Sequence, residues 1–238
     1  MLAAVFSPDG KLVATASRDR TARIWQVDDG REIRILKGHR AAVNSVVFHG
    51  DNQHVLTASD DSTAIIWNLA GTSIGQVRHD GEVKTAVYSP DGKRILTASS
   101  DRSARIWNAE AQALESTLPH DLPVLWAAFT TDGRVFSTEW RGGLNIWSTP
   151  ESVEPVKFEL YVWRGGVHSD SGRVLTWRGH GVRVLDDLEP VRVNDPRLWR
   201  ATPYCMPVSE REKLLHVLEN TARENRERCQ TRVRETRE

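Results

Sequence analysis

The strongest constraint in this sequence is a unit of about forty residues that recurs along the chain. Four similar segments, ARIWQ, AIIWN, ARIWN and LNIWS, place Trp25, Trp67, Trp107 and Trp147 at spacings of 42, 40 and 40 residues. A fifth segment, VRVLD, carries Leu185 at the same place in the repeat. Each copy must form one structural unit, so the repeat decides the fold before any single motif does.

A turn sequence precedes the end of every unit. Its copies are SPDG at 7–10, HGDN at 49–52, SPDG at 89–92, TTDG at 130–133 and SDSG at 169–172. Between the turns, short runs alternate apolar and polar residues, which indicates four short antiparallel strands and no helix. Four strands cannot bury both faces alone, so we predict an all-β propeller of about five four-stranded antiparallel blades. The expected blades span approximately residues 1–37, 38–77, 78–117, 118–158 and 159–193.

The sequence resembles the WD-repeat β-propeller family. The resemblance rests on the Gly38-His39 dipeptide, the SPDG turns and the terminal I-W-N, and it covers roughly residues 2–193. It implies a rigid, non-enzymatic scaffold or sensor module whose loops bind other proteins. It also implies a buried, hydrogen-bonded tetrad in a blade, in which Asp orients His, His contacts Ser, and Ser reaches the Trp N–H. The expected tetrads are His39, Ser59, Asp61 and Trp67, and His79, Ser99, Asp101 and Trp107.

These Ser, His and Asp residues superficially resemble a catalytic triad. An enzyme needs one active site, whereas a repeated fold needs the same clamp in every blade, so the recurrence favours a structural role. The first unit keeps Ser17, Asp19 and Trp25 but has no His. The fourth unit keeps His120 and Trp147, with Glu139 and Arg141 where Ser and Asp are expected. The pattern therefore weakens toward the C-terminal end of the repeat region.

Two other classes of function are weighed against the scaffold. A propeller hydrolase needs carboxylates or histidines converging on the axis, and the expected inner strands, AAVFS, NSVVFH, KTAVYS, LWAAFT and LYVWRG, offer none at a shared position. We therefore predict no catalytic residue, no cofactor and no metal. Nucleic-acid binding is the main alternative, although 32 Lys and Arg balance 32 Asp and Glu, which removes a global attraction to polyanions.

The resemblance places the loops between second and third strands, together with the loops entering each first strand, at one end of the blades, here called the rim. Trp140 stands out because Arg18, Asp60 and Ser100 occupy its place in other units; it is either a partner contact or a filler in an irregular blade. Trp126, Trp163 and Trp177 fall in the same divergent units. The predicted partner-binding residues are Arg18, Arg20, Arg40, Asp60, Glu82, Arg102, Trp140 and Arg141.

Ring closure is left open by the sequence. Residues 2–6 already read as an innermost strand, and no strand precedes them to complete the last blade. Either five blades close by packing alone, or further blades come from a second copy, a partner, or a longer parent protein, which we favour. Self-association through open blade flanks is one of these options, because an uncovered flank exposes an apolar face.

The repeat stops after Val193 and two further segments follow. We expect residues 194–207 to form a proline-containing linker and residues 208–238 to form a helical tail. The tail begins with a Ser209-Glu212 capping box and carries an apolar stripe. This stripe docks either on the same chain or on another chain. Linker and tail are similar to C-terminal regions of large bacterial signalling proteins. Cys205 and Cys229 fit reduced thiols, and no stretch is apolar enough to cross a membrane, so we expect a cytoplasmic protein without a membrane partner.

Overall fold

The computed structural model describes residues 1–110, 112–130, 133–140, 143–148, 155–158, 164–167, 174–178 and 181–185 of the 238-residue chain. These residues form nineteen β-strands and, within those ranges, no α-helix. The first strands are β1 (Ala3–Phe6), β2 (Leu12–Ala16), β3 (Thr21–Gln26), β4 (Glu32–Lys37), β5 (Val43–Phe48), β6 (His54–Ser59), β7 (Thr63–Asn68), β8 (Ser73–Arg78), β9 (Val83–Tyr88) and β10 (Arg94–Ser99). The others are β11 (Ser103–Asn108), β12 (Leu114–Pro119), β13 (Val124–Phe129), β14 (Val135–Glu139), β15 (Leu144–Trp147), β16 (Val156–Phe158), β17 (Arg164–Val167), β18 (Val174–Arg178) and β19 (Gly181–Leu185).

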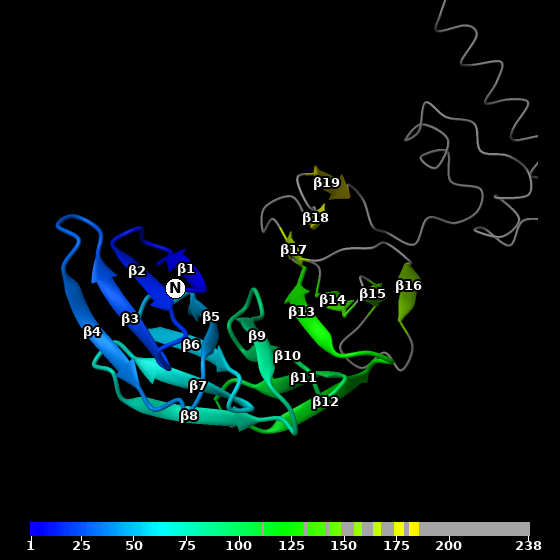
Figure 1. Cartoon of the computed structure of the whole chain (residues 1–238), viewed down its shortest axis with the longest axis horizontal. Helices are drawn as coiled ribbons and strands as arrows, with labels where there is room; N and C mark the ends of the chain where they lie inside the picture. The colour runs from blue at the N-terminus through cyan, green and yellow to red at the C-terminus, as the bar shows by residue number, and fades with distance from the viewer. Residues whose placement is uncertain are drawn as a thin grey trace, which may run out of the picture. The chain divides into compact units, whose positions relative to one another are not determined.

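The strands form antiparallel sheets in which neighbours follow chain order (Figure 1). Four sheets have four strands each, β1 to β4, β5 to β8, β9 to β12 and β13 to β16, and β17 to β19 form a sheet of three described strands. Because all neighbours are antiparallel, the turn between first and second strands lies at the end of the sheet opposite to the rim.

The SPDG turn ends the first strand through its own side chains. In the third sheet Ser89 Oγ donates to Asp91 Oδ1 at 2.6 Å, and Asp91 Oδ1 accepts the N–H of Lys93 at 3.1 Å. Ser89 Oγ also accepts the N–H of Arg94 at 2.9 Å, which starts the second strand. Gly92 has a φ of 73°, a backbone conformation that glycine adopts without strain. The turn sequence therefore sets the register of the first hairpin of the blade.

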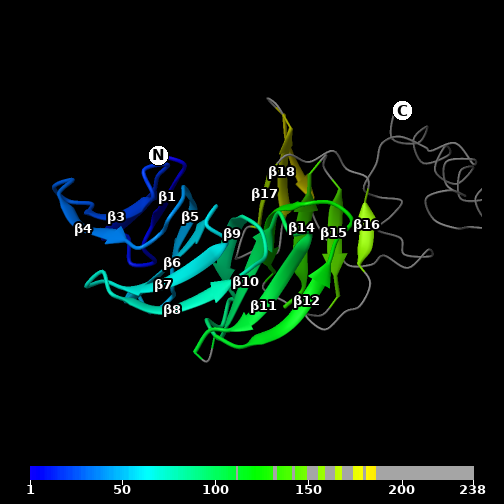
Figure 2. The same cartoon turned by 60° about the horizontal axis from the view of Figure 1, so that its bottom comes forward.

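The first four sheets follow one another in chain order (Figure 2), and each of the three interfaces between them has its own apolar core. In chain order, each sheet buries one face against the next, so the second, third and fourth sheets alternate with layers of buried side chains. Small residues such as Ala58 and Ala64 on one face leave room for Trp107 on the facing sheet. The buried residues between the second and third sheets are Leu56, Ala58, Ala64, Ile66, Val77, Val83, Ala86, Ile95 and Trp107.

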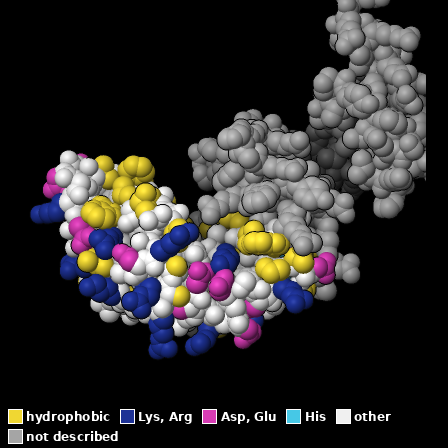
Figure 3. Space-filling model, viewed as in Figure 1, with side chains coloured by type: hydrophobic (Ala, Val, Ile, Leu, Met, Phe, Trp, Pro, Cys, Tyr) yellow, Lys and Arg dark blue, Asp and Glu magenta, His cyan; other side chains and the backbone are white. Residues whose placement is uncertain are grey.

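The outer face of the first sheet differs from the corresponding faces of the later sheets. Phe6 of β1 takes the place held by Phe48 in β5 and Phe129 in β13, yet Phe6 is 64% exposed and each of the others is 8% exposed. Trp25 is likewise half-buried where Trp67 is 1% exposed. Figure 3 shows hydrophobic side chains gathered over this end. The face that buries against a preceding sheet in later blades is thus open in the first.

The predicted all-β fold of four-stranded antiparallel blades is confirmed for the described part of the chain. The chain divides into residues 1–186, which contain all nineteen strands, and residues 187–238. The expected linker (194–207) and helical tail (208–238) lie outside the described residues. In the part that is described we find no helix with the length and apolar content to cross a bilayer.

Candidate functional site

Buried polar side chains link the rim to the strands in the third sheet. His79 Nδ1 lies 2.8 Å from Asp101 Oδ2, and His79 Nε2 lies 2.6 Å from Thr97 Oγ1. Trp107 Nε1 donates to the same Thr97 oxygen at 2.9 Å. Four side chains from the loop before β9, from β10, from the following turn and from β11 thus form one continuous clamp.

Burial fixes the direction of the hydrogen bonds in this clamp. Desolvation lowers the pKa of His79 below its ordinary value, even though Asp101 acts in the opposite direction, so the imidazole is neutral near pH 7. Burial alone raises the pKa of Asp101, but hydrogen bonds from Ser103 and His79 outweigh it and lower that pKa. An ionised carboxylate only accepts, so Nδ1 carries the proton and Nε2 accepts from the Thr97 hydroxyl. Thr97 in turn accepts from the indole.

The second sheet repeats this clamp with the same atoms. His39 lies 2.9 Å from Asp61 and 2.7 Å from Thr57, and Trp67 Nε1 donates to Thr57 at 2.8 Å. Gly38 supports the arrangement, because a Cβ at this position would lie 2.8 Å from the Trp67 ring. As in the third sheet, burial is the main cause that lowers the pKa of His39.

The hydroxyl of the clamp corrects the sequence interpretation, which placed Ser59 and Ser99 between His and Trp. Trp67 pairs directly with Val55, and its indole reaches the diagonal neighbour Thr57, two residues along the strand. Ser59 lies further on, where its Oγ accepts the N–H of Asp61 at 3.1 Å. Ser99 accepts the N–H of Asp101 in the same way, at 3.1 Å. The serines shape the turn, and the threonines join His to Trp.

The fourth and first sheets keep part of the clamp. His120 lies 2.7 Å from Ser137 Oγ, which also accepts Trp147 Nε1 at 3.0 Å, while His120 Nδ1 lies 2.8 Å from the Leu118 carbonyl. Glu139, expected in place of Ser, accepts instead from Asn145 Nδ2 at 3.1 Å.

In the first sheet, Trp25 donates to Thr15 at 2.9 Å. Ser17 and Asp19 belong to the adjoining turn, where the Asp19 N–H points to Ser17 Oγ at 3.4 Å. The sheet thus retains the Trp and hydroxyl part of the clamp.

The clamps are built to hold structure. The side chains of His79 and Asp101 are 0% and 8% exposed, and Thr97 is fully buried. Nucleophilic catalysis needs a hydroxyl that a substrate can reach, together with donors aimed at the reacting oxygen. The clamp fixes the loop that enters the first strand of each of these two sheets. Asp61 Oδ2 also accepts the N–H of Arg40 at 2.8 Å, and Asp101 Oδ2 also accepts the N–H of Asp80 at 3.2 Å.

The two groups of rim loops meet through main-chain hydrogen bonds in the second, third and fourth sheets. The N–H of Asp60 donates to the Ala42 carbonyl at 3.0 Å, and that of Ser100 to the Glu82 carbonyl at 2.9 Å. In the fourth sheet the N–H of Trp140 donates to the Pro123 carbonyl at 2.7 Å. These bonds bring the predicted rim residues to one end of the described sheets.

A charged cluster joins the rims of the second and third sheets. Lys84 Nζ lies 2.8 Å from Asp60 and 2.5 Å from Glu82, and Asn44 Nδ2 donates to Asp60 at 2.6 Å. Burial acts to lower the pKa of Lys84, but the hydrogen bonds to Asp60 and Glu82 outweigh it and raise that pKa. Two of the predicted contact residues are therefore paired with Lys84, a residue that the repeat pattern did not single out.

The remaining predicted rim residues project outward. Arg18, Arg20, Arg40 and Arg102 are exposed, and Trp140 is 57% exposed. Arg20 and Arg102 have φ values of 72° and 66°, a left-handed conformation that side chains other than glycine adopt at a cost. Arg141 lies outside the described residues, as does Trp163, while Trp126 is half-buried in β13 and Trp177 belongs to β18.

Comparison with known proteins places similar sequences over the first three sheets. Residues 2–26, 30–68 and 71–108 match the family model described as WD domain, G-beta repeat. A segment of 41 residues, 17% of the chain, is 44% identical to 6% of the general transcriptional corepressor TUP1 of Saccharomyces cerevisiae. Another of 37 residues, 15% of the chain, is 51% identical to 9% of the WD repeat and SOCS box-containing protein 1 of Danio rerio.

A third relative is an uncharacterised WD repeat-containing protein of Nostoc sp., 44% identical over 45 residues, or 19% of the chain and 3% of that protein. The matched segments thus span less than a tenth of the length of each relative.

Proposed function

Because residues 2–26, 30–68 and 71–108 match the WD40 repeat, we propose that the protein is a non-enzymatic scaffold that binds another protein through its rim. WD repeats imply a role in protein–protein interaction; the rim as the binding surface is our proposal. The cytoplasm as its location and a bacterial signalling protein as its context are part of the same proposal. We draw them from composition and from the resemblance of the C-terminal segments.

The exposed indole of Trp140 carries the proposal. Large aromatic side chains are normally buried, and Trp and Arg are the residue types most enriched among interface hot spots. Trp140 is 57% exposed although its main-chain N–H is tied to the Pro123 carbonyl, so the ring is presented from an anchored position. Rim arginines that are also exposed, such as Arg102, can pair with carboxylates of a partner.

Replacing Trp140 with alanine is expected to weaken partner binding by about 2 kcal/mol or more, about 30-fold in Kd. The full chain, its Trp140→Ala variant and an Ile74→Ala control serve as baits, and the captured protein is then purified and titrated by calorimetry. Ile74 suits the control because it is 47% exposed on β8, an outer strand. Equal binding by Trp140→Ala and wild type would remove the rim from the proposal.

Nucleic-acid binding through the arginines is the alternative, and a propeller hydrolase is the less favoured one. Asp60 and Glu82 stand on the same rim, and Lys84 is already engaged by both carboxylates, which reduces the positive charge offered to a phosphate backbone. Figure 3 shows acidic and basic side chains interspersed on the visible face. Binding to DNA or RNA that weakens steeply with salt would replace the protein-partner proposal.

A second interaction follows from the open face of the first sheet. For the chain on its own, without the further blades that a longer parent protein would supply, we propose that this face, which includes Ala4 and Phe6, packs against another copy of the chain. The equivalent faces of the second and fourth sheets are covered by the preceding sheet, as the 8% exposure of Phe48 and Phe129 records. A net charge of zero places no electrostatic barrier in the way of two copies.

Light scattering on the full chain tests this contact. We expect a mass above 26.8 kDa at micromolar concentration, and a return to 26.8 kDa in a Phe6→Glu variant, because a buried carboxylate opposes association. Leu114→Glu is the matched control, since Leu114 is 51% exposed on the outer strand β12. A wild-type chain that is monomeric at every concentration, or association that Phe6→Glu leaves intact, would contradict the proposal.

A further inference from the structure

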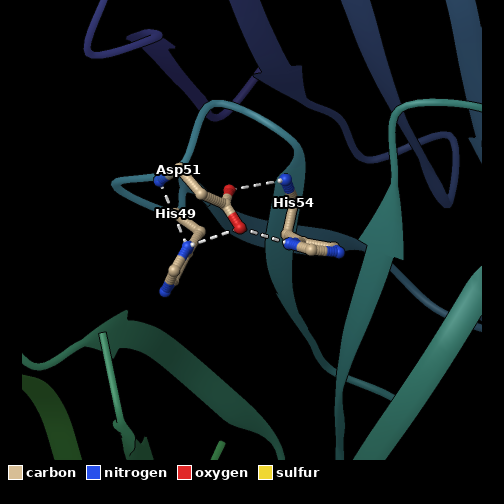
Figure 4. A group of neighbouring side chains, drawn as sticks. All are labelled: His49, Asp51 and His54. Atoms are coloured by element: carbon tan, nitrogen blue, oxygen red, sulfur yellow. Dashed lines mark hydrogen bonds and ion pairs between the residues drawn. The ribbon is translucent and has the colours of Figure 1, made fainter. Parts of the chain in front are cut away.

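Two histidines and an aspartate meet at the turn between β5 and β6, at the end of the second sheet opposite to the rim (Figure 4). Asp51 Oδ2 lies 3.0 Å from His49 Nδ1 and 2.6 Å from His54 Nδ1. The three side chains offer ligand atoms that all lie within 4.8 Å of one another. All three are partly exposed, with side-chain accessibilities of 24% to 34%.

This arrangement departs from the turn that the other sheets use. In the third sheet the same positions hold Ser89, Asp91 and Arg94, and Ser89 itself satisfies Asp91. In the second sheet Asp51 Oδ1 still closes the turn by accepting the N–H of Gln53 at 2.7 Å.

The second carboxylate oxygen of Asp51 is therefore left for the rings of His49 and His54. Burial acts to raise the pKa of Asp51, but the hydrogen bonds from the Gln53 N–H and from the His54 ring outweigh it and lower that pKa to about 2. The group is thus an anion at neutral pH.

The surroundings of His49 define which ring nitrogen can bind a cation. His49 Nε2 lies 3.3 Å from the Gly92 carbonyl, which only accepts, so Nε2 carries the proton. Its Nδ1 then carries the lone pair, which accepts the Asp51 N–H at 3.2 Å and lies 3.0 Å from Asp51 Oδ2. A lone pair facing a carboxylate is stabilised by a cation between them. Metal-binding histidines commonly donate their second nitrogen to a carbonyl in this way.

We propose that His49 Nδ1, Asp51 Oδ2 and His54 Nδ1 bind a divalent transition-metal ion of the zinc type. Two imidazoles and one carboxylate suit Zn²⁺, whereas Ca²⁺ and Mg²⁺ take oxygen ligands. Bonds of about 2.0–2.2 Å in a tetrahedral site separate neighbouring ligands by about 3.3–3.5 Å. The partly exposed side chains reach that spacing by small rotations.

The site opens on a cleft between the second and third sheets. Its volume is about 610 Å³, and Asp91, Lys93 and Glu110 of the third sheet are part of its lining. With three protein ligands, a bound ion keeps a fourth position directed at water or at a group from a partner. Because His49 also contacts Gly92 and stacks edge-on against Tyr88 at 4.6 Å, the ion would tie the second sheet to the third. This metal site lies at the opposite end of the sheets from the rim, so it is separate from the surface proposed to bind a protein partner.

Titration of the full chain with Zn²⁺ by calorimetry, and with Co²⁺ by visible absorption, tests the site. The decisive variant combines His49→Ser with His54→Arg, which gives these two positions the residues that the third turn has there, Ser89 and Arg94. We expect it to bind one ion fewer than the wild type, while His168, His180, His216 and both cysteines stay unchanged in both proteins. Zinc at 100 times its Kd should raise the folded-to-unfolded ratio of the wild type about 100-fold more than that of the variant.

Two further variants keep the proposal falsifiable if the double variant folds poorly. Asp51→Asn keeps the turn acceptor and should weaken Zn²⁺ binding at least 10-fold. Asp91→Asn removes the matching turn carboxylate of the third sheet and should leave the stoichiometry unchanged. Equal numbers of ions bound by wild type and double variant, or Mg²⁺ bound as tightly as Zn²⁺, would overturn the assignment.

Discussion

Replacing Trp107 with alanine is expected to lower the free energy of unfolding by about 3–5 kcal/mol. Trp107 is 7% exposed and fills the layer between the second and third sheets, against residues such as Ala86 and Ile95. Its removal leaves a cavity and also takes the indole donor from the buried Thr97 hydroxyl. Urea denaturation followed by far-UV circular dichroism measures this loss of stability. The slope of the free energy of unfolding against urea concentration should be the same in both proteins, which checks that unfolding is two-state.

Trp25→Ala is the matched control for this prediction. Trp25 ends the same strand of the first sheet and donates to Thr15 at 2.9 Å, but it is only half-buried because the outer face of that sheet is open. We expect about half the loss seen for Trp107→Ala, measured at a protein concentration where the chain is monomeric. Equal losses for the two variants would mean that Trp25 is covered as fully as Trp107.

The fold was predictable because its signals recur with the repeat. One tryptophan and one turn could belong to many folds, but four tryptophans with matching turns require the same hairpins again and again, as the Ser89 and Asp91 hydrogen bonds explain. An uncovered flank was one of the alternatives that the sequence left open, and the exposure of Phe6 shows where such a flank lies in the first sheet. The sequence of a single blade contains no comparable repeated signal that identifies which sheet packs against its open face.

Parts of the site were harder to predict because they depend on contacts between blades or on exact strand register. Lys84 joins Asp60 across two sheets, a contact that no period in the sequence encodes. The threonine of the clamp did leave a signal in the sequence, because Thr-Ala-Ser recurs as VATAS, VLTAS and ILTAS at the end of the second strand in the first three sheets. Thr and Ser share that period, so only the pairing of Val55 with Trp67 decides between them.

Replacing Thr97 with valine is expected to destabilise the protein by about 2–6 kcal/mol, although the side chains have nearly the same shape. The Thr97 hydroxyl donates to His79 and accepts from Trp107, so its loss leaves two fully buried polar groups without a partner. Each such group costs about 1–3 kcal/mol. Thr97→Ser is the control, because it keeps the hydroxyl and loses one methyl group, for which we expect less than about 1.5 kcal/mol. Ser137 holds this position in the fourth sheet with the same two partners.

A double-mutant cycle separates the hydrogen bonds from packing. Trp107→Phe removes the indole N–H. When Thr97→Val is made in that background, it leaves one fewer buried donor without a partner, so it should destabilise the protein by about 1–3 kcal/mol less than in the wild type. If Thr97→Val costs the same in both backgrounds, the indole does not depend on this hydroxyl. If Thr97→Val and Thr97→Ser cost the same, the hydroxyl itself contributes nothing. In either case the chain from Asp101 to Trp107 would be a set of packed neighbours and no longer a clamp that holds the rim.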